Sequence, residues 1–331
     1  MSGERAPGEA ASGRIAAEYV LPIKRDTGVH DPDLDAYLAS LVRWIDVTVV
    51  DGSDDHVFAE HASRWPEAVR HIRPAPSTGI NGKVAGVVTG LRRARHERVV
   101  IADDDVRYDH STLRAVVRAL AEADIVRPQN YFDPLPWHAR WDTARTLVNR
   151  AFSSDYPGTL AVRRDLLVDA GGYDPDVLFE NLELIRTVTA LGGRELRADG
   201  IFVLRRPPEA ARFIEQRVRQ AYDDFAQPVR LVIELALLPG ILWAARRPGR
   251  LVVGAASAVA IAEIGRRRAG GVTVFPRTSA LWAPLWIAER AICVWVALVA
   301  RLRGGVRYRG RRILRAANSE RTLRTRMRRA R

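Results

Sequence analysis

The sequence predicts an α/β protein with a doubly wound sheet, followed by helices that associate with a membrane. Short apolar runs rich in β-branched residues alternate with segments of helical spacing, which is typical of parallel sheets with helices on both faces. Acidic residues directly follow two of the predicted strands, where α/β sheets bind ligands. After Pro228 the composition changes to long apolar stretches with arginines at their ends, which indicates membrane helices.

Composition narrows the class of protein. The chain has 331 residues, of which 47% are hydrophobic, so it can bury a sizeable core. Its single cysteine, Cys293, cannot form an internal disulfide and fits a reducing compartment. The formal net charge of +13 is concentrated in a carboxyl-terminal arm, where thirteen arginines and one glutamate lie between Arg301 and Arg331. Such arms bind anionic membrane lipids or nucleic acid. We favour membrane lipids and no nucleic acid, because the charge is confined to one arm and the sequence has no nucleic-acid recognition module.

The predicted elements follow in chain order. Residues 1–16 are rich in glycine, alanine, serine and glutamate, which predicts disorder, and they hold no apolar run typical of a signal peptide. Residues 17–227 form the α/β domain. Its predicted strands are 19–23, 45–50, 69–72, 99–102 and 125–128, and its predicted helices are 33–44, 57–65, 81–94, 111–123 and 137–150.

Three consecutive carboxylates, Asp103, Asp104 and Asp105, follow the apolar strand 99–102. Carboxylates crowded at a strand end repel one another unless a cation lies among them. Because side chains alternate along an extended segment, Asp103 and Asp105 point to the same side. Carboxylates together with substrate phosphates are the ligands that a hard divalent cation prefers. The pattern therefore predicts a site for Mg²⁺ or Mn²⁺ at Asp103 and Asp105, and a solvated acidic turn is the alternative.

A second strand end carries Asp51, and Gly52 allows the tight turn that exposes its carboxylate. In a doubly wound sheet the carboxyl ends of parallel strands meet at one edge, where ligands bind beside the point at which strand order reverses. A nucleotide can therefore lie across both loops, with its base near Asp51 and its phosphates near Asp103.

Three segments, Val49–Ser53, Asn81–Lys83 and Ala102–Val106, resemble the nucleotide-sugar half of family 2 glycosyltransferases, which have the GT-A fold. The resemblance implies that Asp51 contacts the nucleobase and that the D-x-D pair of Asp103 and Asp105 binds the metal that bridges the donor's phosphates. It also implies that Lys83 lies near the nucleotide. An ordinary residue in the first turn of a helix is the alternative for Lys83.

The next part of the chain resembles the acceptor half of the same family. Pro157–Arg164 resembles the strand before the acceptor site, and Gly171–Tyr173 resembles the family's glycine–glycine–aromatic turn. Glu180, Asn181 and Glu183 stand where the family has Glu-Asp-x-x-Leu, whose aspartate is the usual catalytic base. An asparagine amide cannot accept a proton at neutral pH. We therefore expect Glu180 to be the base, with Glu183 as the second candidate and Asn181 orienting the acceptor.

A polar helix face follows at Gln216 and Arg219, which are three residues apart and so share one side of a helix. This segment resembles the Q-x-x-R-W motif of membrane-bound family members, with Gln220 in place of the tryptophan. The resemblance implies that Arg219 binds a phosphate through its fork of donors and that Gln216 binds a sugar hydroxyl. A polar face turned to solvent is the alternative.

Three apolar stretches form a membrane-associated region at residues 228–303: Leu231–Ala245, Leu251–Ile264 and Ala280–Leu302. The first two are shorter than an untilted span of about 20 residues, so a soluble helical bundle is the alternative. The basic tail, residues 304–331, contains Val306–Arg312. This segment resembles the W-R-G-R-x-Y segment of ceramide glucosyltransferases and related bacterial lipid glycosyltransferases, with a tyrosine in place of the tryptophan.

Together these features predict a GT-A glycosyltransferase held at the cell membrane, with its catalytic domain in the cytoplasm. By the resemblance, it moves a sugar from a nucleotide-sugar donor, a UDP-sugar being favoured, to a hydroxyl of a lipid acceptor with inversion. The alternative, which Asn181 motivates, is a degenerate member that binds nucleotide-sugar without turnover and serves as a membrane scaffold. The sequence leaves the sugar, the lipid, the number of membrane crossings and the oligomeric state open.

Overall fold

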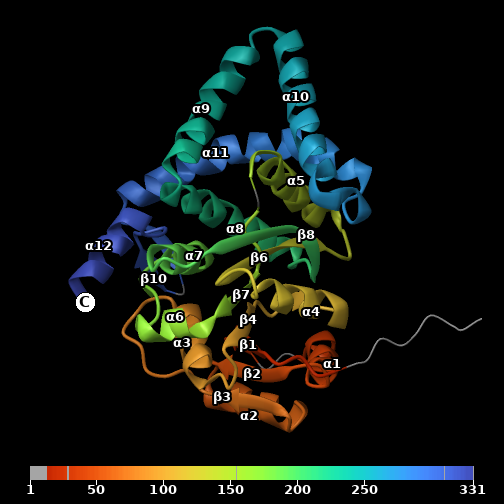
Figure 1. The fold of residues 1–331 in the computed structure, drawn as a ribbon. Helices are drawn as coiled ribbons and strands as arrows, with labels where there is room; N and C mark the ends of the chain where they lie inside the picture. Colours follow the sequence, from red (N-terminus) through yellow and green to blue (C-terminus); the bar gives the residue numbers. More distant parts are fainter. Residues whose placement is uncertain (1–12, 28–29, 154, 309, 331) are drawn as a thin grey trace, which may run out of the picture.

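The computed structural model describes residues 13–27, 30–153, 155–308 and 310–330 (Figure 1). Of the segment predicted to be disordered, residues 1–12 lie outside this description. Within it, Ile15 is buried and its backbone amide donates to the carbonyl of Trp44 at 2.7 Å. Order therefore begins at least as early as Ile15, before the first strand.

A mixed sheet, eight-stranded over the described residues, forms the centre of the molecule. Its strands are β1 (Glu18–Ile23), β2 (Asp46–Asp51), β3 (Val69–Ile72), β4 (Arg98–Ala102), β5 (Val106–Arg107), β6 (Ile125–Phe132), β7 (Thr159–Arg163) and β8 (Glu195–Arg205). They lie in the order β3-β2-β1-β4-β7-β6-β8-β5. The first four run parallel, as the alternation of strands and helices predicts. β7 pairs antiparallel with both β4 and β6, so the sheet is not parallel throughout.

Helices cover both faces of this sheet. They are α1 (Pro32–Leu41), α2 (Asp55–Arg64), α3 (Gly82–Arg93), α4 (His110–Ala119), α5 (Trp137–Phe152), α6 (Arg164–Asp169), α7 (Glu180–Ala190) and α8 (Ala210–Tyr222). One core cluster packs α1 and α4 against the sheet, and a second packs α3, α6 and α7 against the other face. α3 begins where the sequence predicts, because the Asn81 side chain accepts from the backbone amide of Lys83 at 3.1 Å. Such a cap stabilises a helix by about 1 kcal/mol and fixes the position of the first turn.

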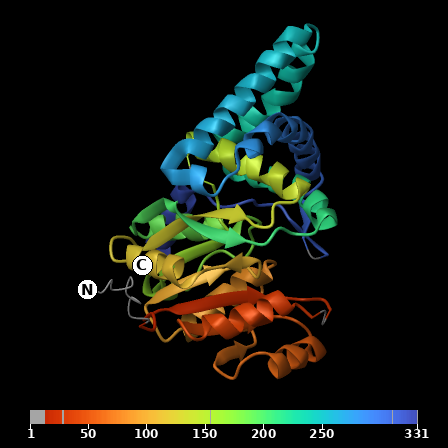
Figure 2. The ribbon, with the colours of Figure 1, turned by 90° about the vertical axis from the view of Figure 1, so that its right-hand side faces the viewer.

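Two apolar helices project from the body as a hairpin (Figures 1 and 2). These are α9 (Pro228–Ala244) and α10 (Pro248–Arg267), reached through a short 3₁₀ helix, η1 (Asp223–Ala226). Large apolar side chains on the hairpin are exposed, with Val229 at 77% and Val252 at 68%. A soluble helical bundle would bury these side chains, so the exposure favours a membrane or another apolar surface around the hairpin.

The last apolar helix, α11 (Ala283–Leu302), differs from the hairpin because it lies along the α/β domain (Figure 1). It follows two 3₁₀ helices, η2 (Arg268–Thr273) and η3 (Arg277–Trp282). Trp286 and Val294 are buried on one of its faces, whereas Ile292 and Leu302 are exposed. By length and composition, two of the described segments are able to cross a membrane, Pro248–Thr273 and Arg277–Leu302. The shorter α9 is not among them.

The tail after α11 packs on the α/β domain. It contains a two-stranded hairpin of β9 (Val306–Tyr308) and β10 (Arg311–Ile313), and then α12 (Glu320–Ala330), which lies beside α7. Ile313 and Leu323 are buried. Asp174 on the α/β domain pairs with Arg315 at 3.2 Å and with Arg326 at 2.9 Å. Part of the basic charge therefore neutralises the protein's own carboxylate rather than projecting freely.

Candidate functional site

The two predicted aspartate loops leave the same edge of the sheet. Asp51 is the last residue of β2, and Asp103 follows β4 directly; β1 lies between these two parallel strands. The loop after β4 is held in place by a hydrogen bond from the Asp103 amide to the carbonyl of Gly158 at 2.8 Å. The parallel part of the sheet thus brings both loops to one edge, as predicted.

Asp51 is the centre of a buried hydrogen-bond cluster. Its Oδ1 accepts from the Ser53 amide at 2.8 Å, and its Oδ2 lies 2.7 Å from His61 Nδ1 and 3.1 Å from His71 Nε2. Burial raises the pKa of Asp51, but these hydrogen bonds outweigh burial and hold it well below its usual value. The carboxylate has no exposed surface, so the turn at Gly52 does not expose it as the sequence suggested.

The two histidines were not foreseen from the sequence. His61 stacks on Trp65 with ring centroids 4.6 Å apart, and His71 stacks on Phe58 at 3.8 Å. The signal available in the sequence was the four-residue spacing of His61 and Trp65, which puts both on one face of the segment that begins as α2. Ligand atoms of Asp51, His61 and His71 all lie within 4.8 Å of one another, so this group is a candidate for holding a metal ion.

The second aspartate loop is a turn and not the extended segment that the sequence suggested, because the Val106 amide donates to the Asp103 carbonyl at 3.1 Å. Asp103 and Asp105 still lie on one side of it, as predicted. Asp103 and Asp105 both face Arg205, at the end of β8, whereas Asp104 pairs with Arg25 at 3.0 Å. Arg205 Nε lies 2.9 Å from both oxygens of Asp105, and its Nη2 lies 3.6 Å from Asp103 Oδ2. A guanidinium cation therefore lies where the sequence predicts a divalent one.

Lys83 joins the strand end to α7. Its Nζ lies 2.5 Å from Asp103 Oδ1 and 2.6 Å from Glu180 Oε1. Burial lowers the pKa of Lys83, but these two carboxylates outweigh it and raise the pKa above its usual value. For Asp103, burial raises the pKa, but the positive charges of Lys83 and Arg205 outweigh burial and hold the pKa below its usual value. Lys83 therefore holds its charge between two carboxylates, Asp103 and Glu180.

Asp105 differs from Asp103 in its electrostatics. Burial raises its pKa to about 6; Arg205 opposes this shift, while Asp103 and Asp104 add to it. The pair thus combines one carboxylate stabilised in its charged form with one that binds a proton more readily.

The three residues predicted to act on the acceptor, Glu180, Asn181 and Glu183, have different partners in the structure. Glu180 contacts Lys83, as described. It therefore belongs to the charged cluster formed by Lys83, Asp103, Asp105 and Arg205. Asn181 donates through Nδ2 to the carbonyl of Pro157 at 3.0 Å. Glu183 is completely buried and accepts from Asn318, at 2.6 Å from its backbone amide and 2.7 Å from its side chain. The structure therefore brings Glu180 to the cluster and commits Glu183 to holding the tail.

The motif on α8 and the tail meet at the same cluster. The Arg219 guanidinium lies 5.1 Å from the ring centroid of Tyr308, and the Tyr308 hydroxyl donates to Asn81 Oδ1 at 3.3 Å. Arg219 also contributes to lowering the pKa of Asp103. Gln216 is half-buried on α8, one turn before Arg219. Residues more than two hundred positions apart thus converge beside the cap of α3.

Asp223, in η1, is a further acidic residue of the site that sequence reasoning missed. Its Oδ1 is buried and has no hydrogen-bond partner among the described residues. Burial raises the pKa of Asp223 to about 8; Asp224 and Glu180 add to the shift, and Arg219 opposes it. Its only sequence signal was its position four residues after Arg219, which puts both side chains on one helix face.

Comparisons with known proteins give a consistent picture. The model of the family described as "Glycosyltransferase like family 2" matches residues 34–223. The mannosyltransferase PcManGT from Pyrobaculum calidifontis, solved in complex with GDP-Man and Mn²⁺, is similar with a TM-score of 0.52 and 18% identity, covering 88% of this chain and 91% of that chain. A mycobacterial protein has a TM-score of 0.41 and 19% identity over 63% of this chain and 74% of its own. No curated protein matches the sequence.

Proposed function

Because this chain belongs to glycosyltransferase family 2, we propose that it transfers a sugar from a UDP-sugar to a lipid hydroxyl at the cytoplasmic face of the cell membrane. The chain is a glycosyltransferase with a GT-A-like fold, and its reaction is glycosyl transfer from a nucleotide-sugar. The observation that carries the proposal is the convergence of Lys83, Asp103 and Glu180 from three different elements at one strand end.

The donor is proposed to lie across the edge of the sheet, with its base near Asp51 and its diphosphate near Asp103. Both oxygens of Asp51 already accept hydrogen bonds, so we propose that Asp51 acts on the base through the groups that it orients. Lys83 and Arg219 supply positive charge for the diphosphate. The structural neighbour was solved with GDP-Man, which makes a GDP-sugar the competing donor.

A divalent cation, Mg²⁺ or Mn²⁺, fits the donor set at Asp103 and Asp105. Both carboxylates face one point, and a single guanidinium lies against both. Oxygen ligands of this kind suit hard cations that are also bound by phosphates. When bound, such a cation stabilises the negative charge that develops on the leaving diphosphate. The group of Asp51, His61 and His71 is the alternative position for a cation.

For the chemical step we propose Glu180 as the base. The acceptor oxygen forms a bond to the anomeric carbon while the bond from that carbon to the diphosphate oxygen breaks, and the acceptor's proton passes to Glu180. Attack opposite the leaving group inverts the anomeric centre. Asn181 orients the acceptor, and Gln216 binds a sugar hydroxyl. Glu183 is the lesser candidate for the base, because both of its oxygens accept hydrogen bonds from Asn318.

The lipid acceptor and the membrane are proposed from the carboxyl-terminal helices. The hairpin of α9 and α10 exposes apolar side chains along its length, and Arg246, Arg247 and Arg250 lie at its tip. This suits a hairpin whose walls contact lipid tails while its arginines reach polar headgroups. α11 packs one face on the catalytic domain and exposes apolar residues on the other, which suits a helix lying in the membrane interface.

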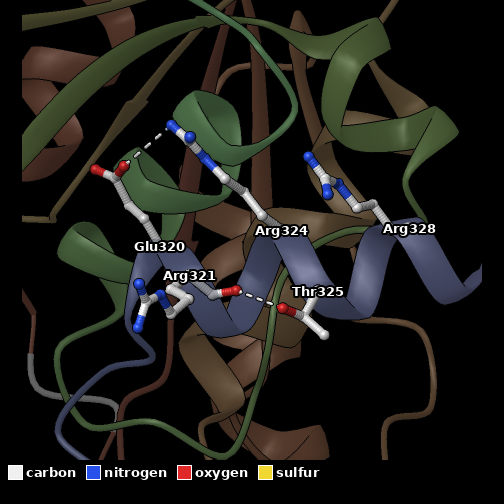
Figure 3. Close-up of a pocket in the computed structure, with 5 residues that line it drawn as sticks. All are labelled: Glu320, Arg321, Arg324, Thr325 and Arg328. Atoms are coloured by element: carbon white, nitrogen blue, oxygen red, sulfur yellow. Dashed lines mark hydrogen bonds and ion pairs between the residues drawn. The ribbon is translucent and has the colours of Figure 1, made fainter.

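The basic tail is proposed to add contacts with anionic lipids. Arg324 and Arg328 project to the same side of α12 at a surface hollow (Figure 3). Arg324 is 3.5 Å from Glu320, so it is partly neutralised, whereas the hollow as a whole remains basic. This hollow shares no residue with the cluster around Lys83, so its occupant is not the donor.

A non-catalytic scaffold that binds nucleotide-sugar is the second candidate. It is favoured by Asn181, whose amide occupies the family's base position and is bound to the Pro157 carbonyl. The deciding experiment incubates membranes that contain the full chain with labelled UDP- and GDP-sugars and extracted lipids. A labelled lipid supports the enzyme and identifies donor and acceptor together. Donor binding without transfer to any lipid supports the scaffold.

A further inference from the structure

Arg205 contacts both carboxylates that are predicted to bind the metal, Asp103 and Asp105, which we call the metal pair. Its guanidinium lies 2.9 Å from both oxygens of Asp105 and 3.6 Å from Asp103. The pKa of Arg205 is raised above its usual value by Asp105 and Asp103, which outweigh burial. Hydrogen bonds between a guanidinium and a carboxylate are charge-assisted and stronger than neutral ones, and here Nε alone contacts both oxygens of Asp105 while Nη2 lies toward Asp103. The metal pair therefore already has a cation belonging to the protein.

The backbone around Arg205 is shaped for this contact. A Cβ atom on Gly158 would lie 2.8 Å from Asp103 Oδ2 and 3.2 Å from the Arg205 Cζ. A side chain at this position would therefore push on both members of the pair. The same residue accepts, through its carbonyl, from the Asp103 amide at 2.8 Å. Gly158 thus provides the space in which a guanidinium lies against both carboxylates.

The charge balance of the site shows how the contact between Arg205 and the metal pair affects cation binding. Three acidic and three basic side chains at the strand end balance one another when all are ionised: Asp103, Asp105 and Glu180, with Lys83, Arg205 and Arg219. The neighbouring Asp223, whose pKa burial raises to about 8, is mostly protonated at neutral pH and adds little charge. Asp104 is balanced separately by Arg25. A divalent cation alone would add two positive charges to a partly buried neutral cluster, which is unfavourable. A divalent cation that arrives with a diphosphate adds no net charge.

We propose that Arg205 and the divalent cation compete for Asp103 and Asp105, and that the donor's diphosphate resolves the competition by drawing the guanidinium onto its phosphate oxygens. Arg205 is then a diphosphate-binding residue, and donor and cation bind as a coupled pair. This inference rests on the proposed function, because it requires a donor with a diphosphate. Guanidinium groups bind phosphate oxygens in the same forked geometry as carboxylates, so the exchange costs Arg205 few hydrogen bonds.

The test titrates Mn²⁺ into the purified full chain in detergent and measures free Mn²⁺ by electron paramagnetic resonance. Arg205→Met removes the guanidinium and keeps the length of the side chain, and we expect it to bind Mn²⁺ alone at least about tenfold tighter than the unaltered chain. Arg206→Met is the matched control, because Arg206 is the next residue and pairs with Asp33 at 2.9 Å instead. It should bind Mn²⁺ like the unaltered chain.

A second measurement follows UDP and GDP binding by calorimetry without metal. Arg205→Met should weaken the binding of whichever nucleotide binds by at least about tenfold, since a phosphate partner is lost. Arg205→Lys keeps the charge but loses the fork, so both effects should be smaller. If Arg205→Met does not fold, Arg205→Lys still tests whether Arg205 competes with Mn²⁺ and binds the nucleotide.

The outcomes separate this inference from the proposed function. If Arg205→Met binds Mn²⁺ no tighter than the unaltered chain, Arg205 does not compete with the cation. If the gain in Mn²⁺ binding survives when Asp105→Asn is added, the ion is not held by the pair of Asp103 and Asp105, and the inference is equally overturned. If neither UDP nor GDP binds the unaltered chain with Mn²⁺ present, the proposed function fails. The competition for Mn²⁺ alone is still decided by the first measurement.

Discussion

Glu180 and Glu183 lie one turn apart on α7, and the structure predicts opposite consequences for the same substitution at each. Glu180→Gln keeps an oxygen that can accept from Lys83 Nζ, which lies 2.6 Å away in the unaltered chain. It removes the charge of the pair, so we expect a loss of about 1 kcal/mol in the free energy of unfolding. It also removes the oxygen that we propose accepts the proton, so turnover should fall about 100- to 10,000-fold. Donor affinity should change far less, because the lysine and Asp103 remain.

Glu183→Gln is the matched control. Both oxygens of Glu183 accept from Asn318, and a glutamine would turn an NH₂ group toward one of those donors. Burial raises the pKa of Glu183, and the hydrogen bonds from Asn318 oppose that shift. Losing one charge-assisted bond should cost about 1.5–3 kcal/mol of stability. The folded fraction should keep turnover within a few-fold, because this side chain holds the tail and not the acceptor.

The assay measures three quantities on membranes or detergent-purified full chain: transfer of labelled sugar to lipid, donor affinity, and thermal unfolding. The expected pattern is low turnover with near-normal stability for Glu180→Gln, and near-normal turnover with low stability for Glu183→Gln. Turnover within a few-fold of normal in Glu180→Gln refutes its role as base. A loss of turnover in Glu183→Gln without a loss of stability would show that Glu183 reaches the acceptor after all.

Three further predictions concern the metal pair, η1 and the hairpin. Asp105→Asn, like chelation of the unaltered chain, should abolish transfer while the protein stays folded, as circular dichroism would show; full activity in saturating chelator contradicts the metal role. Because the pKa of Asp223 is raised to about 8 from 3.8, the folded state binds its proton more tightly than the unfolded state. Stability contributed at this position should therefore fall as pH rises from about 4 to 8, by at most about 1.4 kcal/mol per pH unit. Asp223→Asn should flatten the measured stability in that window, and an unchanged pH profile contradicts the raised pKa. The full chain should stay with membranes through high-salt and alkaline washes, since its hairpin exposes apolar side chains, whereas Val232→Glu with Val252→Glu should release it into the soluble fraction; release of the unaltered chain by salt alone contradicts a membrane-embedded hairpin.

The local arrangement of the site could be predicted from the sequence because it depends on short-range geometry. The sequence predicted that Asp103 and Asp105 share one side, and both contact Arg205 whereas Asp104 pairs with Arg25, although these residues form a turn and not an extended segment. The Asn81 cap fixes where α3 begins, and with it the position of Lys83. Each of these features depends on dihedral angles and hydrogen bonds within a few residues.

Strand direction and the wider fold were only partly predictable. Alternating strands and helices indicated the parallel part of the sheet, but the apolar run of β7 carries no mark of its direction. β7 lies antiparallel between β4 and β6, because the chain returns to the sheet from the opposite end after α5. Periodicity reports which face of a segment is buried and not which way the segment runs.

By itself, the sequence determined the family, the order of most elements and the residues at the strand ends, because these are encoded in patterns a few residues long. Only the tertiary structure decided which charges meet. Arg205 is one arginine in an arginine-rich chain, and its role follows from β8 lying beside β5, about a hundred residues from its partner Asp105. Glu183 and Asn318 are 135 residues apart, and no local pattern indicated that Glu183, a candidate base, contacts the tail. Such pairs arise when packing brings distant segments together and buries their charges, which then require partners that no local pattern specifies.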